Sequence, residues 1–267
     1  MDDRIIVHKQ GHVAWLTFNR PQRLNAMTIE TWFLMDEKLA ELDKDRDIRC
    51  LILAGEGRSF LAGHDVGEIR EHNEDIKSGK LTASQLREWQ KSLQNSTRLI
   101  RTVRFPVVAA VQGYAVGAGC EVCVACDLVV ASEDAMFGFP EVNIGVTITN
   151  GGTFLLSRKV GLARARELAY TGEFISATEA HRIGLVNRVV ANGEVRAEAQ
   201  KLATRIASRA PVAVQLHKVM LDAAGESSLD TALNFETEAL VQTALTRDNL
   251  EGTNAWFEKR EPKFTGE

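Results

Sequence analysis

The sequence lacks a hydrophobic run long enough to cross a membrane. A spanning helix needs ~20 consecutive apolar residues, and no stretch of the 267-residue chain approaches that length. The N-terminal MDDRIIVHKQ has no signal-peptide core, and its early acidic residues do not suit a transit peptide. The C-terminal KFTGE matches no common targeting signal. We therefore expect a cytoplasmic protein that has no membrane partner.

The chain also lacks an excess of positive charge. It carries 32 Lys and Arg against 36 Asp and Glu, which gives a formal net charge of −4 and a pI near 5.9. Proteins that bind nucleic acids or anionic membranes usually present a basic surface. We expect neither partner. Hydrophobic residues make up 45% and charged residues 25% of the chain, a balance typical of one large globular domain or a domain with an appendage.

Several motifs of common enzyme classes are missing. The chain contains no GxxxxGK[ST] phosphate loop, no helix-opening GxGxxG of a dinucleotide site, no GxSxG elbow of a serine hydrolase and no HExxH metal motif. The six histidines are scattered, so the sequence predicts no metal site. We expect surface or structural roles for five of them, which are His8, His12, His72, His181 and His217.

Cysteine is scarce, but three of the four cysteines are close together. Cys120, Cys123 and Cys126 form a CxxCxxC pattern that superficially matches an iron–sulfur ligand run. A cluster would need a fourth thiolate, and the only candidate is Cys50, within an apolar run. Free cysteine often behaves as a small buried hydrophobe. We therefore favour core packing over a cluster, and disulfides are not expected in the cytoplasm.

The periodicity of the chain predicts strands in the first half and helices in the second. Apolar runs predict a hairpin and three further strands, at 5–9, 13–18, 50–54, 107–111 and 128–131. Helical spacing predicts segments at 29–43 (with Thr28 as N-cap), 83–103, 153–158, 160–171, 177–183, 193–208, 210–223, 228–246 and 250–258. The polar stretch 70–82 is expected to be an exposed, mobile loop. This order indicates a parallel-rich sheet with a helical extension.

The most informative stretch is FPVVAAVQGYAVGAGCEVCVACDLV, residues 105–129. Gly113, Gly117 and Gly119 lie within seven residues, and one acid, Glu121, follows them in small apolar company. Clustered glycines before a helix let a ligand approach backbone N–H groups, whereas a carboxylate in apolar surroundings is costly unless it is paired or useful. The stretch therefore predicts an anion or oxyanion site with Glu121 beside it. The alternative is tight helix packing with Glu121 solvated at an edge.

Four ordered motifs resemble the crotonase (enoyl-CoA hydratase/isomerase) superfamily over nearly the whole chain. NRPQRLNAM (19–27) is similar to that family's NRPxxxNA loop, and SFLAGHDV (59–66) to its FxAGxD element. QGYAVGAGCE (112–121) and FPEVNIGV (139–146) are similar to its NGxxxGGGxE and PExxxG elements. The resemblance implies an α/β fold: a spiral core of ββα turns over residues 1–200, and a C-terminal helical region over 201–267 that trimerises. Two trimers would form a homohexamer.

The resemblance also assigns catalytic positions. The backbone N–H groups of His64 and Ala118 occupy the places that form the family's oxyanion hole for the thioester carbonyl. Glu121 and Glu141 match the two glutamates of the family's hydratases. Because backbone supplies the oxyanion donors, the side chains at 64 and 118 can differ from the usual ones.

The resemblance further implies contacts to coenzyme A, as part of an acyl-CoA substrate rather than as a separate cofactor. On the same chain the matching positions are Arg23, Leu24, Ala62, Asp65 and Val66. A second pair matches residues that often approach the coenzyme A of a neighbouring subunit. This pair is Trp256 and Lys259.

The chain departs from the family pattern at two places near the site. Where many hydratases read GTIPGAGG after the second glutamate, residues 145–152 read GVTITNGG. The missing proline and the polar pair Thr149-Asn150 are expected to reshape the pocket near the acyl tail. Ala118 replaces the commoner glycine and adds a methyl group beside the oxyanion hole.

The leading functional hypothesis is an enoyl-CoA hydratase that adds water syn across the 2,3 double bond of a short acyl-CoA thioester. A weaker resemblance to methylthioacryloyl-CoA hydratases adds thioester hydrolysis after hydration. The alternatives are an acyl-CoA thioester hydrolase and a non-catalytic RNA-binding or scaffold homologue. Retention of both glutamates and the acidic pI disfavour the non-catalytic alternative. A double-bond isomerase usually needs only one of the two acids.

Overall fold

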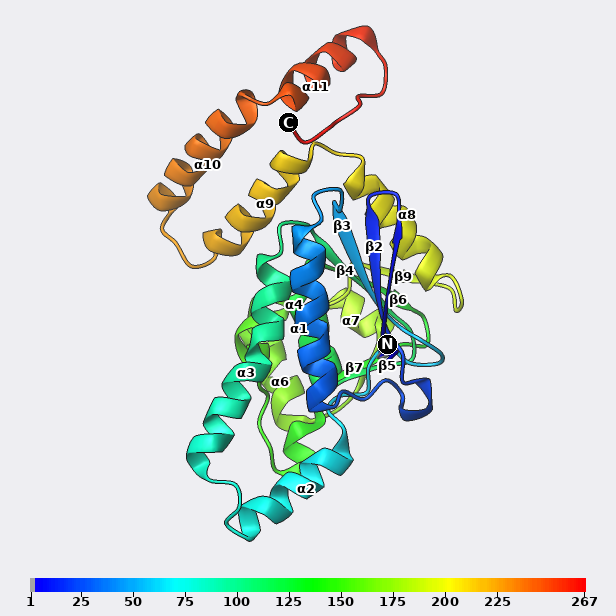
Figure 1. The fold of residues 1–267 in the computed structure, drawn as a ribbon, viewed down its shortest axis with the longest axis vertical. Coiled ribbons are helices and arrows are strands. Elements are labelled where there is room, and N and C mark those ends of the chain that lie inside the picture. The colour runs from blue at the N-terminus through cyan, green and yellow to red at the C-terminus, as the bar shows by residue number, and fades with distance from the viewer. Residues whose placement is uncertain (1–2) are drawn as a thin grey trace.

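A six-stranded sheet forms the centre of this structure, a computed structural model that describes residues 3–267 (Figure 1). In spatial order its strands are β1 (Ile5–Gln10), β2 (Val13–Phe18), β3 (Cys50–Gly55), β4 (Val107–Val111), β6 (Leu128–Ser132) and β9 (Arg188–Val190). β1 and β2 form the predicted antiparallel hairpin, and every other neighbouring pair in this sheet is parallel. The predicted parallel-rich α/β sheet is therefore confirmed.

Two strands lie in the half of the chain where only helices were expected. β9 extends the main sheet beside β6. A smaller sheet contains β5 (Tyr114–Val116), β7 (Met136–Gly138) and β8 (Ile175–Ser176). The prediction that helices fill 153–258 is wrong at β8 and β9. These strands have two and three residues, so they are too short to produce a period-two pattern.

Helices cover both faces of the main sheet. They are α1 (Ile29–Lys44), α3 (Ala83–Thr102), α4 (Ala118–Ala125) and α8 (Val195–Ala207). α8 packs on one face, and α1, α3 and α4 pack on the other (Figure 1). Successive residues of β3 alternate between these layers, with Leu53 in the α1/α3/α4 cluster and Ile52 in the α8 cluster. Burial on both faces explains why the parallel strands read as continuous apolar runs.

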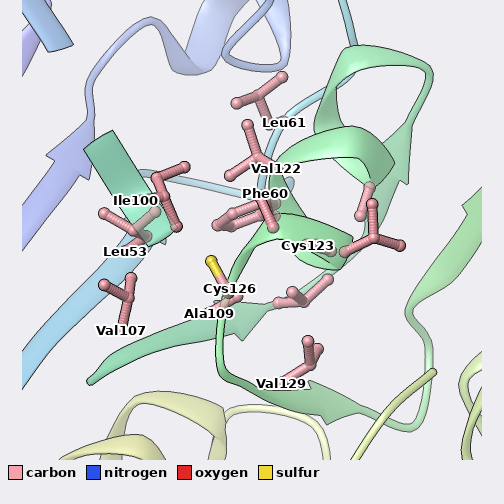
Figure 2. Packing of buried hydrophobic residues seen from close by; sticks show 14 of the residues in the cluster. Leu53, Phe60, Leu61, Ile100, Val107, Ala109, Val122, Cys123, Cys126 and Val129 are labelled. Atoms are coloured by element: carbon pink, nitrogen blue, oxygen red, sulfur yellow. The ribbon is translucent and has the colours of Figure 1, made fainter. Parts of the chain in front are cut away.

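All four cysteines lie in these two clusters. Figure 2 shows Cys123 and Cys126 packed among apolar side chains on the α4 side, where Cys120 also lies. Cys50 belongs to the cluster under α8, on the other face of the sheet. Burial raises the pKa of the Cys50 and Cys126 thiols to about 12. The core-packing interpretation is therefore confirmed, because Cys50 is separated by the sheet from the three cysteines it would have to join.

The stretch 70–82 contains most of a helix, so the predicted loop is wrong there. α2 (Val66–Lys77) begins after Asp65, whose carboxylate accepts a hydrogen bond from the Gly67 N–H at 3.0 Å. None of its residues is buried. The polar composition suggested a loop because this helix has little apolar surface to bury, although Ile69 and Ile76 have helical spacing from Val66.

Three further helices follow the site loops, and three more form a C-terminal arm. The former are α5 (Gly152–Val160), α6 (Leu162–Thr171) and α7 (Ala177–Arg182). The arm consists of α9 (Pro211–Ala224), α10 (Leu229–Ala244) and α11 (Arg247–Glu258), and it projects from one end of the sheet (Figure 1). The expected division at residue 200 stays a prediction. No helix among residues 3–267 is both long enough and apolar enough to cross a membrane.

Buried Lys218 anchors this arm to the core. Its Nζ donates hydrogen bonds to the carbonyl oxygens of Ile100 (2.9 Å) and Phe105 (3.0 Å). It also lies 3.0 Å from a carboxylate oxygen of Asp127, which precedes β6. A buried charge needs such partners, so α9 is held in a defined position on the core.

Candidate active site

A cavity of about 440 Å³ opens between the N-terminus of α4, helices α2 and α3, and the loop that follows Pro140. Six of the residues predicted for the site line it together. They are Ala62, His64, Val66, Ala118, Glu121 and Glu141. Much of the remaining wall is apolar and comes from Ile69, Ile76, Leu86, Leu93, Val116, Ile144 and Val146. A predominantly apolar cavity with a few converging polar groups is typical of a small-molecule site.

Glycines allow two backbone segments to meet at this cavity. A Cβ on Gly119 would overlap the carbonyl oxygen of Leu61, so α4 approaches that segment as only glycine permits. A Cβ on Gly63 would lie 3.8 Å from the Ala118 nitrogen, so the residue that precedes His64 lies beside Ala118. Within residues 3–267, neither the His64 nor the Ala118 N–H donates to a protein acceptor. The site therefore has two unused backbone donors, as the oxyanion hypothesis requires.

Glu121 is buried, with 2% of its surface exposed. Oε1 accepts a hydrogen bond from the Thr149 N–H at 2.5 Å, and Oε2 accepts one from Asn150 Nδ2 at 2.8 Å. Burial raises the pKa of Glu121, and the hydrogen bonds from Thr149 and Asn150 oppose that rise. The alternative of a solvated edge residue is wrong. Tight glycine packing and a buried, hydrogen-bonded carboxylate occur together at the N-terminus of α4.

Glu141 has different surroundings. It lies in a 3-10 turn, η2 (Pro140–Ile144), and is half-buried. Its Oε2 is buried and has no hydrogen-bond partner in the described part of the chain. Burial, with a smaller contribution from the Glu121 charge, raises the pKa of Glu141 to about 7. Such a carboxyl can hold or release a proton near neutral pH.

The family follows from comparison with known proteins. The enoyl-CoA hydratase/isomerase family matches residues 8–267. The chain belongs to this family. Membership confirms the resemblance to the crotonase superfamily, the α/β fold class with a C-terminal helical region, and the enzyme class, a hydro-lyase of the enoyl-CoA hydratase type.

Individual relatives match over almost the whole chain. A short-chain-enoyl-CoA hydratase of Clostridium acetobutylicum is 41% identical over 97% of this chain and 96% of its own. A crotonyl-CoA hydratase of Syntrophomonas wolfei is 37% identical over 98% of both chains. A crystal structure of an enoyl-CoA hydratase from Bacillus anthracis, 33% identical, matches with a TM-score of 0.91 and covers 99% of this chain and 100% of that one.

Two of the positions predicted to contact coenzyme A, on different loops, lie side by side. The Ala62 N–H donates to the carbonyl oxygen of Leu24 at 3.0 Å, so the two predicted contacts are adjacent. Arg23 is exposed at the end of a short 3-10 turn, η1 (Pro21–Arg23). Asp65 also has a structural function, because its carboxylate caps α2 and pairs with Arg20 at 3.1 Å.

The predicted C-terminal contacts are not part of the same cavity. Trp256 is 83% exposed on α11, and Lys259 follows that helix in a left-handed conformation. In Figure 1, α11 lies at the end of the molecule opposite α2. Neither residue lies with the six predicted residues that line the cavity, whereas Leu24 is hydrogen-bonded to one of those six.

An aromatic group on α1, α2 and α3 was missed from the sequence. His72, for which a surface or structural role was expected, lines the cavity with its ring 4.7 Å from that of Trp89. Trp32 Nε1 donates to Nδ1 of His64 at 3.3 Å. Burial, with a smaller contribution from His72, lowers the pKa of His64 to about 4, so this imidazole is neutral at pH 7. Val66, Ile69 and Ile76 have helical spacing, and this pattern could have predicted the helix that places His72 at the cavity.

Proposed function

We propose that this chain hydrates short-chain 2-enoyl-CoA thioesters by syn addition of water across the 2,3 double bond. One observation carries the proposal: two carboxyls with opposite surroundings line the same cavity as two unused backbone N–H groups. The names of the relatives from Clostridium acetobutylicum and Syntrophomonas wolfei support a short acyl chain. A largely apolar cavity of about 440 Å³ is consistent with an acyl group of modest size.

The oxyanion donors are the backbone N–H groups of His64 and Ala118. Water adds to the β-carbon only if the negative charge that develops on the thioester oxygen is stabilised. Two fixed donors do this without reorganisation, and loss of one such donor typically costs ~10²–10³ in rate. The absence of competing acceptors for both N–H groups in the described chain supports this role.

Glu121 acts as the general base, and Glu141 acts as the general acid. Both oxygens of Glu121 accept hydrogen bonds from N–H groups, which favours its ionised form. Glu141, with a pKa of about 7, carries a proton at neutral pH and below. Glu121 takes a proton from water, the oxygen bonds to the β-carbon, and Glu141 delivers a proton to the α-carbon. The proton left on Glu121 returns to Glu141 through solvent before the next turnover.

The coenzyme A part of the substrate contacts Arg23, Leu24 and Ala62, alongside Asp65 and Val66. The exposed position of Arg23 supports an ionic contact with a phosphate, and the Leu24–Ala62 hydrogen bond supports one joint binding loop. No separate cofactor is needed for this reaction. A cytoplasmic location also stays a prediction.

The arm mediates assembly into a trimer, and two trimers form a hexamer. It exposes large apolar side chains that a monomer would leave in water, namely Leu221, Leu229, Leu240, Leu245, Leu250, Trp256 and Phe257. In such an assembly Trp256 and Lys259 would reach the coenzyme A of a neighbouring subunit. Light scattering at micromolar concentration tests this, and a monomer would contradict it.

A panel of acyl-CoA esters tests the reaction directly. Short 2-enoyl-CoA esters and their saturated analogues are assayed in parallel for loss of enoyl absorbance and for release of free thiol. We expect loss of enoyl absorbance without thiol release. Thiol release after hydration would add the hydrolytic step, and thiol release from saturated esters would replace the hydratase with a thioester hydrolase. No change in either signal would contradict the proposal.

A further inference from the structure

Asn150 connects Glu121 to helix α3. Its Nδ2 donates to Oε2 of Glu121 at 2.8 Å, and its Oδ1 accepts a hydrogen bond from Gln90 Nε2 at 3.3 Å. Its backbone carbonyl accepts a hydrogen bond from the Thr97 hydroxyl at 2.8 Å. Only 5% of the Asn150 surface is exposed. Both ends of the side-chain amide and the backbone carbonyl are therefore engaged.

The backbone at this position is also specialised. Asn150 has a φ of 48°, in the left-handed region that few residues other than glycine and asparagine adopt readily. Two residues later, a Cβ on Gly152 would lie 2.5 Å from the Ile148 side chain and 3.2 Å from Cγ of Glu121. The loop therefore passes close to Glu121, and its conformation directs the Asn150 amide at the carboxylate.

The chemistry of the two partners fixes which way the amide points. An ionised carboxylate only accepts hydrogen bonds, and Gln90 donates to the other end of the amide, so Nδ2 must face Glu121. The N–H of Thr149 occupies the second carboxylate oxygen. A proton on Glu121 would weaken one of these two bonds.

We propose that Asn150 is a positioning residue, whose amide keeps Glu121 ionised and correctly oriented while α3 holds that amide in place. The proposal rests on the assignment of Glu121 as the general base. It gives Asn150 a function beyond shaping the pocket near an acyl tail.

The surroundings of Glu121 allow its titration to be distinguished from that of other groups. The α3 residues in this chain of hydrogen bonds, Gln90 and Thr97, are neutral, and α5 presents Gly152. On α4 the nearest titratable neighbour is Cys120, whose pKa is raised by burial so that its thiol is neutral. Glu141 on η2 is a further titratable group that interacts electrostatically with Glu121. Loss of the amide should therefore act on the acid limb of the activity profile, which reports Glu121.

The decisive variant is Asn150→Gly, because glycine keeps the left-handed backbone and removes only the side chain. A hydrogen bond to a charged group corresponds to roughly one pKa unit. We expect the acid limb of kcat/KM to move up by about one pH unit, so that activity below the limb falls roughly tenfold. The basic limb should stay in place, and KM should change little.

Two further variants separate the amide from the fold. Asn150→Asp keeps the shape but replaces the donor with a second acid, so its acid limb should shift at least as far as that of Asn150→Gly. Asn192→Gly changes an asparagine in a loop outside the cavity and should leave the profile unchanged. Thermal unfolding of all three variants identifies any loss of folded protein.

Infrared titration of the Glu121 carboxyl, assigned with Glu121→Gln, provides a readout without substrate. The pKa of Glu121 should rise in Asn150→Gly and Asn150→Asp even if no enoyl-CoA tested is hydrated, which separates this inference from the proposed function. An unchanged Glu121 pKa in both folded variants would overturn the inference. A fall in kcat that is equal at all pH values, with both limbs in place, would also overturn it.

Discussion

The N-terminus of α4 and the turn η2 each supply one carboxyl to the cavity, but the two regions are built differently. Glu121 lies in a helix whose eight residues are all buried. Glu141 lies in a turn with no buried residue, and residues 142–147 after it are exposed. Glu121 has hydrogen-bond donors on both oxygens, whereas Oε2 of Glu141 has no partner in the described chain.

This difference indicates how one site can hold a base and an acid of the same residue type. Burial raises the pKa of both carboxyls, but hydrogen bonds from Thr149 and Asn150 oppose that rise at Glu121, whereas only its own backbone N–H opposes it at Glu141. In the proposed mechanism, the base therefore lies in a fully buried helix, and the acid lies in a turn without buried residues.

The largest expected effect comes from removing either carboxyl. General acid–base catalysis contributes typically ~10²–10⁴-fold, so Glu121→Ala and Glu141→Ala should each lower kcat by at least that amount. The double variant should be little worse than either single one if the two carboxyls act as a unit in one step. Steady-state kinetics measures this, with acyl-CoA binding as the control that the site is intact. Near-normal hydration by either single variant would show that the glutamate it lacks is not a catalytic group.

The packing at the N-terminus of α4 can be disrupted without touching a carboxyl. Gly119→Ala forces a Cβ into the Leu61 carbonyl, so α4 must move and carry the Ala118 N–H with it. We expect a ~10²–10³-fold fall in kcat from the displaced oxyanion donor. Gly193→Ala, where a Cβ meets nothing within 4 Å, is the matched control and should affect stability alone. Equal kinetics in the two variants would contradict the proposed role of this packing.

The raised pKa of Glu141 predicts the basic limb of the pH profile. Glu141 must be protonated to act as an acid, and its pKa is raised to about 7. kcat/KM should therefore fall by about tenfold per unit as pH rises above that value. The measurement is kcat/KM for a short enoyl-CoA across pH 5 to pH 9. A kcat/KM that stays constant up to pH 9 would contradict the assignment of Glu141 as the general acid.

The smallest expected effect lies outside both regions. Arg23→Ala should raise KM by up to about fivefold through a lost phosphate contact, while kcat stays nearly constant, because this contact is equal in ground and transition states. Comparison of CoA esters with truncated pantetheine esters checks the cause. The truncated esters lack the nucleotide phosphate, so their KM should be the same with the variant and with the unchanged protein. A large fall in kcat at unchanged KM would contradict a binding role.

Much of the core could be predicted because its signals are local. The apolar runs of β2, β3, β4 and β6 and the N-cap Thr28 of α1 each specify one element within a few residues. The motif around Gly119 and Glu121 was also readable, since clustered glycines before a lone acid are unusual. The roles of Glu121 and Glu141, however, came from resemblance to a family rather than from their spacing.

Other features depend on contacts between distant segments and could not be read locally. Asn150 is a polar residue in a loop until its contacts with Gln90 and Glu121 are known. His72 lies on a helix with no buried residue, so its polar stretch resembled a loop. The short strand β9 forms only because β6 provides an edge to pair with.

The central claim is that Glu121 activates a water and Glu141 donates a proton at the same face of the double bond. The most direct test is hydration of crotonyl-CoA in D₂O, followed by NMR determination of the configuration at both carbons of the product. The account predicts one deuterium at the α-carbon, added on the same face as the new hydroxyl group. Anti addition, or a mixture of both α-carbon configurations, would contradict it.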